Sequence, residues 1–327
     1  MDGQKLRIVL PGGSGQVGHL LAQHFHAEGH AVTVLSRSSH PEPWRVVAWN
    51  GSASGEWTRE LENADVCINL SGKSVNCRYT TANRREIYDS RIGTTRRLNE
   101  VIAAMPRPPR LWLNASTATN YRHALDRPMD EATGELGGHE AGAPATWNFS
   151  IQVAQDWEEA FFSTSTPRTR KIAMRSAITL SPDRGSVFEV LLNVVRWGLG
   201  GKMGTGKQFV SWIHGKDFVR AVDWLIARED FSGVVNLASP NPLPNEDFMR
   251  AFREEWGARI GLPAPEPLIE LGCFLMRTES ELVLKSRRVV PGRLLESGFE
   301  FLFPEWPDAA RDLITRWKEA AKRVRKS

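Results

Sequence analysis

Cysteine is scarce in this chain of 327 residues, and its three copies, Cys67, Cys77 and Cys273, form neither paired spacings nor a Cys-x-x-Cys motif. This usage is typical of a reducing compartment and argues against a disulfide-stapled fold or a cysteine-rich zinc site. The sequence also lacks a run of roughly 20 apolar residues, the length that crosses a bilayer. Its first residues lack the apolar core of a signal peptide. We therefore expect a cytoplasmic protein without a membrane partner.

A strong excess of one charge sign is absent too. The chain has 42 Lys and Arg against 38 Asp and Glu, a net charge of +4, so a nucleic-acid partner is not expected. The histidines show no carboxylate pairing at metal-ligand spacing, and no metal is expected. Part of the basic excess lies near the C-terminus, in Arg316, Lys318, Lys322, Arg323, Arg325 and Lys326. This cluster favours a solvated helix face, with contact to a polyanion as the alternative.

What is present is an alternation of short apolar runs with helical patterns. Strands are predicted at 6–10, 31–35, 45–49, 65–70, 111–115, 170–180 and 234–238, and the longest helices at 81–105 and 148–162. Alternation of this kind predicts an α/β protein with a doubly wound parallel sheet of the Rossmann type.

The amino-acid composition changes after residue 180, where the chain has a glycine-rich segment at 198–206 and proline-rich stretches near 240–244 and 263–267. We predict a nucleotide-binding domain over 1–180, to which 211–238 add the last helix and strand. Residues 181–210 and 239–327 are predicted to form a smaller C-terminal α/β substrate lobe.

The first turn carries the strongest motif. It follows a predicted strand, precedes a predicted helix, and consists of Gly12, Gly13, Ser14, Gly15, Gln16, Val17 and Gly18. In this context glycines allow the backbone to approach a pyrophosphate, which the N–H groups at the helix N-terminus bind. The sequence therefore predicts a dinucleotide site.

The next strand ends in Ser36-Arg37, where proteins that bind NAD usually place a carboxylate on the ribose 2′-hydroxyl. A guanidinium pairs with a 2′-phosphate through two hydrogen bonds, and Ser36 can donate another. We therefore expect the cofactor NADP(H), with a solvated Arg37 as the alternative.

Together with later segments, these residues resemble the epimerase-family branch of the extended short-chain dehydrogenase/reductases, whose members carry a C-terminal domain of unassigned function. The resembling segments are Cys67-Ile68-Asn69-Leu70-Ser71-Gly72, the helix with Arg85, Glu86 and Arg91, Asp156-Trp157-Glu158, Gly198-Leu199-Gly200-Gly201, Ser211-Trp212-Ile213-His214 and Arg287-Arg288-Val289-Val290-Pro291. The resemblance implies NADP contacts at Leu70, Ser71, Gly72, Glu86, Arg91 and Ser116, besides Ser36 and Arg37.

Most enzymes of that superfamily use a Tyr-x-x-x-Lys pair on one helix face. Here the residues four positions after Tyr79, Tyr88 and Tyr121 are Asn83, Ile92 and Leu125, so the pair is missing. Thr117 and Tyr121 are the remaining candidates, to orient a carbonyl and to donate a proton, with structural roles as the alternative. His214 and Asp217 form a second titratable pair, and we expect them to have a structural role or to lie at the edge of the substrate site.

Two functions follow. The first is an NADP-dependent oxidoreductase or epimerase-like enzyme that acts on a small or nucleotide-linked substrate, compatible with a homodimer. The alternative is a catalytically silent NADP(H)-binding protein whose cofactor occupancy regulates a partner.

Overall fold

The computed structural model describes residues 5–38, 41–51, 55–140 and 143–324. Its strands are β1 (Arg7–Pro11), β2 (Ala31–Ser36), β3 (Arg45–Ala48), β4 (Val66–Asn69), β5 (Leu111–Thr117), β6 (Arg170–Ser176), β7 (Ile178–Leu180), β8 (Phe209–Val210), β9 (Trp212–His214), β10 (Gly233–Leu237) and β11 (Leu243–Pro244). Its helices are α1 (Gln16–Ala27), α2 (Trp57–Leu61), α3 (Thr81–Tyr88), α4 (Thr94–Ala104), α5 (Ala145–Phe162), α6 (Val187–Arg196), α7 (Gly215–Ala227), α8 (Asn245–Trp256), α9 (Glu266–Leu275), α10 (Glu281–Leu284), α11 (Gly292–Glu296) and α12 (Trp306–Val324).

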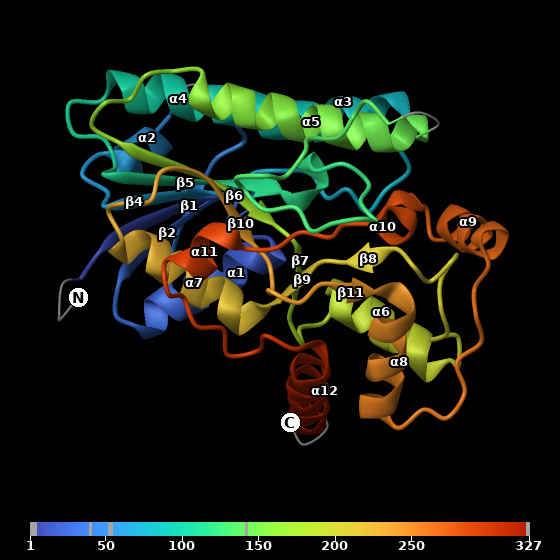
Figure 1. Ribbon diagram of the computed structural model, residues 1–327. Helices are drawn as coiled ribbons and strands as arrows, with labels where there is room; N and C mark the ends of the chain where they lie inside the picture. The colour runs from blue at the N-terminus through green and yellow to red at the C-terminus, as the bar shows by residue number, and fades with distance from the viewer. Residues whose placement is uncertain (1–4, 39–40, 52–54, 141–142, 325–327) are drawn as a thin grey trace.

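A seven-stranded sheet in the order β10-β6-β5-β4-β1-β2-β3 forms the centre of the molecule. Every neighbouring pair in it is parallel. Helices α3, α4 and α5 cover one face, and α1, α7 and α11 cover the other (Figure 1). The strand order reverses between β1 and β4, and in open α/β sheets ligands bind beyond the carboxyl ends of the strands at this point. The predicted fold class is confirmed.

The central strands of the sheet are buried on both faces because they are mainly apolar rather than alternating, whereas the edge strand β3 is partly exposed. Strand β4, for example, is buried along its whole length. One hydrophobic cluster joins the sheet to α1 and α7 and includes Leu21, Phe25 and Phe218. A second cluster joins the other face to α4 and α5 and includes Leu98 and Phe161. These two cores hold the carboxyl ends of the strands in fixed positions.

Two elements of the structure differ from those predicted from the sequence. The run 170–180 is divided into β6, which lies in the central sheet, and β7, which pairs with β9 instead. The predicted helix 81–105 is interrupted by a π-helical turn over Asp89–Gly93. At this turn the Ser90 hydroxyl accepts a hydrogen bond from Lys73 N, 2.8 Å away, and donates to Ile87 O. π-Helical turns occur often at functional sites, and this one contains Arg91.

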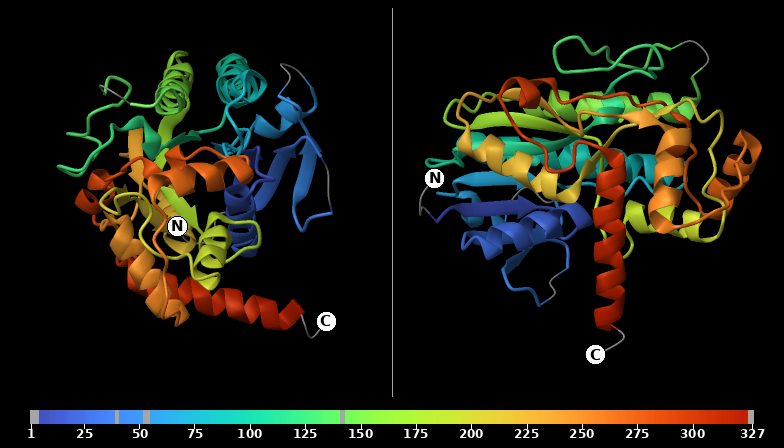
Figure 2. Two further views of the ribbon diagram at one scale, coloured as in Figure 1. Left: turned by 90° about the vertical axis from the view of Figure 1, so that its right-hand side faces the viewer. Right: turned by 60° about the horizontal axis from the view of Figure 1, so that its bottom comes forward.

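The C-terminal region has a hydrophobic cluster of its own, built around Phe188, Phe252 and Trp306. Helix α12 packs against α8 and then extends along the outside of the molecule (Figure 2). On α12, Arg316 lies 3.6 Å from Asp312, and the Lys318 ammonium lies over the Trp256 ring. Arg325 and Lys326, the end of the predicted basic cluster, lie outside the described residues, and so does the side chain of Arg323.

Within the described part of the chain, no helix has both the length and the apolar content needed to span a membrane.

Candidate functional site

The glycine turn links β1 to α1 as predicted. Gly12 has a φ of +73°, and a Cβ there would lie 2.6 Å from the Ser71 backbone. A Cβ on Gly18 would lie 2.3 Å from Gly13 O, because α1 starts close against the turn. By contrast, a Cβ on Gly15 would meet no atom within 4 Å. Gly12 and Gly18 are therefore required by the fold, whereas Gly15 borders open space.

Gly15 is the N-cap of α1 and offers no side chain to the first N–H groups of that helix. Such groups have no partner within the helix, and the helix dipole favours an anion beside them. The turn therefore presents hydrogen-bond donors to the open space at Gly15, which is the arrangement that a pyrophosphate requires.

The end of β4 meets this turn at the point where the strand order reverses. Leu70 N donates to Pro11 O at 2.8 Å, and Ser71 N donates to Asn69 Oδ1 at 3.1 Å. The buried Ser71 hydroxyl has no hydrogen-bond partner among the described residues. Buried hydroxyls rarely stay unpaired, so a bound ligand is a natural partner for Ser71.

Ser36 and Arg37 stand at the end of β2, where the sequence predicted them. Ser36 is buried and lines a small hollow with Gly13, Ser14, Ser38 and Trp44. Glu42 also contributes to the wall of this hollow. The side chain of Arg37 is exposed, and its charge acts on Glu86, which helps to lower the pKa of that carboxyl after the stronger effect of Lys73. Arg37 is therefore open to a ligand.

Two further predicted contacts lie beside the strand ends. The Glu86 carboxylate is 2.5 Å from Lys73 Nζ. Arg91 Nη1 donates to Lys73 O at 2.9 Å and to Ile87 O at 3.2 Å, and its guanidinium lies over the Trp157 ring. Burial lowers the pKa of Arg91 to about 10. No carboxylate in the described part of the chain forms an ion pair with Arg91, which leaves a half-buried cation on the cavity wall.

A cavity of about 460 Å³ extends beyond the carboxyl ends of the strands. Its wall includes Gln16 and Val17 from α1, Leu70 and Gly72 after β4, and Arg91. Ser116 and Thr117 of β5 also line it, together with Trp157 on α5 and Glu281, Leu282 and Arg287 from the C-terminal region. Both parts of the chain thus enclose one space, and the predicted cofactor contacts that line it are Gln16, Val17, Leu70, Gly72, Arg91 and Ser116.

Ser116 is held at the cavity wall by a buried ion pair. Its hydroxyl donates to Glu158 Oε1 at 2.5 Å, and Glu158 accepts two hydrogen bonds from Arg175, at 2.8 and 2.6 Å. Only 12% of the Glu158 side chain and 9% of the Arg175 side chain are exposed. Thr117 also lines the cavity, and its hydroxyl accepts a hydrogen bond from Thr119 N. The hydroxyl of Thr117 remains able to donate to a ligand.

Tyr121 lies elsewhere. Its side chain is 1% exposed, its hydroxyl donates to Asn236 Oδ1 at 3.0 Å, and its ring stacks on the Arg175 guanidinium. It does not belong to the described cavity wall. Proton donation by Tyr121 remains a prediction that this placement does not support, because the side chain is enclosed by protein atoms.

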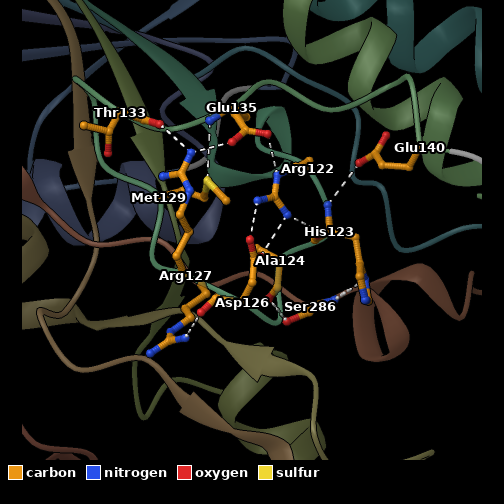
Figure 3. Close-up of polar contacts among 11 residues, drawn as sticks. Arg122, His123, Ala124, Asp126, Arg127, Met129, Thr133, Glu135, Glu140 and Ser286 are labelled. Atoms are coloured by element: carbon orange, nitrogen blue, oxygen red, sulfur yellow. Dashed lines mark hydrogen bonds and ion pairs between the residues drawn. The ribbon is translucent and has the colours of Figure 1, made fainter.

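Arg122, which follows Tyr121, organises the loop beyond β5 (Figure 3). Its guanidinium pairs with Asp126 at 2.7 Å and with Glu135 at 2.8 Å. In the same loop His123 Nδ1 accepts a hydrogen bond from Ser286 N, and Ser286 Oγ donates to Ala124 O. The loop therefore fixes the C-terminal segment that carries Arg287 into the cavity.

Sequence reasoning missed a cluster on the opposite wall, formed by Tyr79, Ser150, Glu281 and Arg287. The Tyr79 hydroxyl is 3.2 Å from Ser150 Oγ, Ser150 Oγ donates to Glu281 Oε2 at 2.5 Å, and Arg287 lies 3.2 Å from Glu281 Oε1. No local pattern joins positions that lie up to about 200 residues apart. The segment that begins at Arg287 resembles the family and so indicated a role for this residue. Nothing in the sequence connected that segment to Tyr79.

The pair His214 and Asp217 has a structural place. His214 Nδ1 accepts a hydrogen bond from Lys216 N and caps α7, and its Nε2 is 3.0 Å from Asp312. The buried Asp217 accepts hydrogen bonds from Leu302 N and Phe303 N, both at 2.8 Å. The two residues tie the C-terminal segment to α7, and neither belongs to the described cavity wall.

The chain matches two family models. One is described as the NAD dependent epimerase/dehydratase family and matches residues 8–238. The other is a domain of unknown function, DUF1731, and matches residues 264–313.

Curated relatives match along most of their length. The human epimerase family protein SDR39U1 is 28% identical over 312 residues, which cover 94% of this chain and 100% of the relative. The epimerase family protein ML0860 of Mycobacterium leprae is 30% identical over 302 residues, which cover 91% of this chain and 92% of the relative.

Among solved structures, human SDR39U1 in complex with NADPH matches with a TM-score of 0.82 over 94% of this chain and 99% of that one, at 28% identity. A UDP-N-acetylglucosamine 4-epimerase from Bacillus cereus has a TM-score of 0.72 over 96% of this chain and 100% of its own, at 16% identity, and shares the fold. The family model spans well over half of the chain, so this protein belongs to the NAD dependent epimerase/dehydratase family, with the DUF1731 domain at its C-terminal end.

Proposed function

We propose that this protein binds NADP(H) and is an oxidoreductase or epimerase-like enzyme of the extended short-chain dehydrogenase/reductase type. The observation that carries the proposal is the end of β2, where Ser36 and the exposed Arg37 stand beside the glycine turn in place of a carboxylate. NADPH in the related human structure supports the choice of cofactor.

The residues present fit the cofactor. The open space at Gly15 and the free donors of α1 suit a pyrophosphate, and the unpaired Ser71 hydroxyl lies beside that turn. Arg37 and Ser36 would hold the 2′-phosphate through charge-assisted hydrogen bonds. Arg91 adds a half-buried cation that forms no ion pair with a carboxylate among the described residues. When bound, NADP(H) supplies hydride chemistry, and this chain's residues bind, orient and exchange protons.

We further propose that the substrate is a small or nucleotide-linked molecule that enters the cavity of about 460 Å³. Residues 1–180 with 211–238 would form the nucleotide-binding unit, and 181–210 with 239–327 the substrate lobe. The two hydrophobic clusters follow this division in most of their members, whereas Leu294 and Phe299 pack in the first cluster and Leu180 and Trp212 in the second. A cytoplasmic location and a homodimer remain part of the proposal.

The proposal is tested at Arg37. We expect Arg37→Ala to raise the Kd for NADPH about tenfold or more and to leave the Kd for NADH unchanged, because a charge-assisted hydrogen bond is worth about 1.5–3 kcal/mol. Fluorescence titration of wild type and variant with both dinucleotides measures the four constants. Arg97→Ala, an exposed residue of α4 that pairs with Glu100, is the control. An equal loss for NADPH and NADH would contradict the assignment of Arg37 to the 2′-phosphate.

A further inference from the structure

The cavity wall carries a row of hydrogen-bonded groups that is separate from the dinucleotide cradle. Tyr79 comes from the segment before α3, Ser150 from α5 and Glu281 from α10, and all three line the cavity. Figure 1 shows α10 beneath the ends of α3 and α5, and the printed contacts join them. Three distant parts of the chain thus meet at one wall.

The direction of the hydrogen bonds in this row follows the charge of Glu281. With Glu281 ionised, Ser150 donates its one hydroxyl proton to Glu281 Oε2, and the Tyr79 hydroxyl donates to Ser150 Oγ. With Glu281 protonated, the carboxyl group can donate to Ser150 Oγ, and Ser150 to the Tyr79 oxygen. Glu281 is 1% exposed and lies 3.2 Å from the buried guanidinium of Arg287, which balances its charge. The row therefore runs from a phenol on the cavity wall to a buried carboxyl group.

Both ends of the row hold protons more tightly than usual. Burial raises the pKa of Tyr79, and the hydrogen bond with Ser150 opposes this effect. Burial also raises the pKa of Glu281, against the charges of Arg287 and Lys285 and the hydrogen bond from Ser150, while Glu279 acts in the same direction as burial. The raised pKa keeps the Tyr79 phenol protonated, as a proton donor must be, and moves the pKa of Glu281 toward neutral pH, where a carboxyl group can exchange protons.

Other titratable groups on the described cavity wall are poor proton donors. Arg91 and Arg287 are guanidinium groups, which keep their protons at neutral pH. Lys73 is engaged by Glu86 at 2.5 Å. Tyr121, as shown above, bonds Asn236 away from the cavity. Tyr79 is the tyrosine that the described wall contains.

The phenol of Tyr79 reaches the cavity face of α5 from another element. That face presents Ser150, Val153 and Ala154 to the cavity, and Ser150 is the residue among them with a hydroxyl group. The Tyr79 ring packs edge-on against Phe149, with centroids 5.1 Å apart.

The segment of Tyr79 is firmly held. Tyr79 N donates to Glu279 Oε1 at 2.6 Å, and Arg78 Nη1 donates to Thr278 O at 3.1 Å. Arg84 Nε donates to Tyr79 O at 2.9 Å. The C-terminal region therefore positions the phenol as well as supplying Glu281.

We propose that Tyr79 is the catalytic acid–base of this protein and that Ser150 and Glu281 form its proton relay, an inference that rests on the proposed NADP(H)-dependent function. In the reductive direction a carbonyl carbon would gain the hydride that NADPH supplies, which leaves NADP⁺; the C=O double bond becomes a C–O single bond, and the oxygen takes the Tyr79 proton. Tyr79 recovers a proton from Ser150, and Ser150 from protonated Glu281. Glu281 is left as a carboxylate beside Arg287 and is reprotonated by a solvent acid, so one hydride and one proton are consumed in each turnover. Oxidation of an alcohol runs these proton transfers in reverse.

The first test measures turnover. NADPH oxidation by a panel of aldehydes and 1,2-diketones is followed by absorbance, with wild type, Tyr79→Phe, Ser150→Ala, Ser150→Thr and Tyr88→Phe. We expect Tyr79→Phe to lower kcat about a hundredfold or more, because positioned acid–base groups contribute 10²–10⁴-fold. Ser150→Ala should also lower kcat, and Ser150→Thr, which keeps the hydroxyl, should restore it. Tyr88→Phe, on α3 outside the described wall, should leave it unchanged.

The second test needs no turnover. The chain has only three tyrosines, so ¹³Cζ-tyrosine labelling gives three NMR signals, assigned by the Tyr→Phe variants. As the pH is varied, we expect the chemical shift of the Tyr79 signal to change when Glu281 titrates and again when Tyr79 itself titrates. Glu281→Gln and Ser150→Ala should each abolish the change that accompanies the titration of Glu281. A Tyr79 signal that neither variant alters would overturn the relay.

The outcomes separate the two proposals. Failure of wild type to bind NADPH contradicts the proposed function, and the tyrosine signals still test the row. NADPH binding without oxidation by any member of the panel overturns the catalytic assignment alone. A Tyr79→Phe variant that binds NADPH and keeps the wild-type kcat overturns it as well.

Discussion

Replacement of Glu158 by alanine is expected to lower the free energy of unfolding by about 3–5 kcal/mol, the usual cost of leaving one member of a buried ion pair alone. Arg175 loses both of its hydrogen bonds to that carboxylate and remains buried against the Tyr121 ring. Ser116, at the cavity wall, loses the acceptor that fixes its hydroxyl. Urea denaturation at neutral pH measures the change.

Two controls separate charge from packing. The double variant Glu158→Leu/Arg175→Met removes both charges and should recover a large part of the lost stability, since buried ion pairs can often be replaced by apolar residues of similar volume. Asp230→Ala breaks the exposed pair with Arg228 and should leave the midpoint unchanged. If the double variant were as unstable as Glu158→Ala, lost packing rather than an unpaired charge would be the cause.

A second large effect is expected at Gly15. Gly15→Val should raise the Kd for NADPH about a hundredfold, because the added methyl groups fill the space that the pyrophosphate needs beside the first turn of α1. The thermal midpoint should barely change, since a Cβ at Gly15 meets no atom within 4 Å. Titration calorimetry and a melting curve give the two values.

Gly272→Val on α9 is the matched control, because its Cβ also meets no atom within 4 Å and the residue lies outside the described cavity wall. It should bind NADPH like wild type. Gly18→Ala shows the opposite behaviour to Gly15→Val: its Cβ would lie 2.3 Å from Gly13 O, so stability itself should fall, by about 1–3 kcal/mol or more. Normal NADPH affinity in Gly15→Val would place the pyrophosphate elsewhere.

The parts of the site that the sequence predicted are those with local patterns. The glycine turn stands between a strand and a helix within a few residues, and Ser36-Arg37 ends the next strand. The buried parallel strands are mainly apolar, and this pattern allowed the sheet to be predicted from the sequence. The family resemblance extended this reading to Arg91 and Ser116 as NADP contacts, and both residues line the cavity.

What the sequence did not reveal depends on contacts between distant segments. Tyr79 and Glu281 are about 200 residues apart, and both reach Ser150 only because α10 folds beneath α3 and α5. The π-helical turn at Arg91 has no signal distinct from an ordinary helix. Tyr121 was a candidate through its position after β5, whereas the bond to Asn236, a residue of β10, turns its hydroxyl away from the cavity. Tertiary packing decided each of these cases.

The most direct test of the central claim is the ratio of dissociation constants of the wild-type protein for NADH and NADPH, measured by titration calorimetry at constant ionic strength. The end of β2, with Arg37 exposed and Ser36 beside the glycine turn, predicts that NADPH binds about tenfold or more tightly than NADH. Equal affinities, or tighter binding of NADH, would contradict the account.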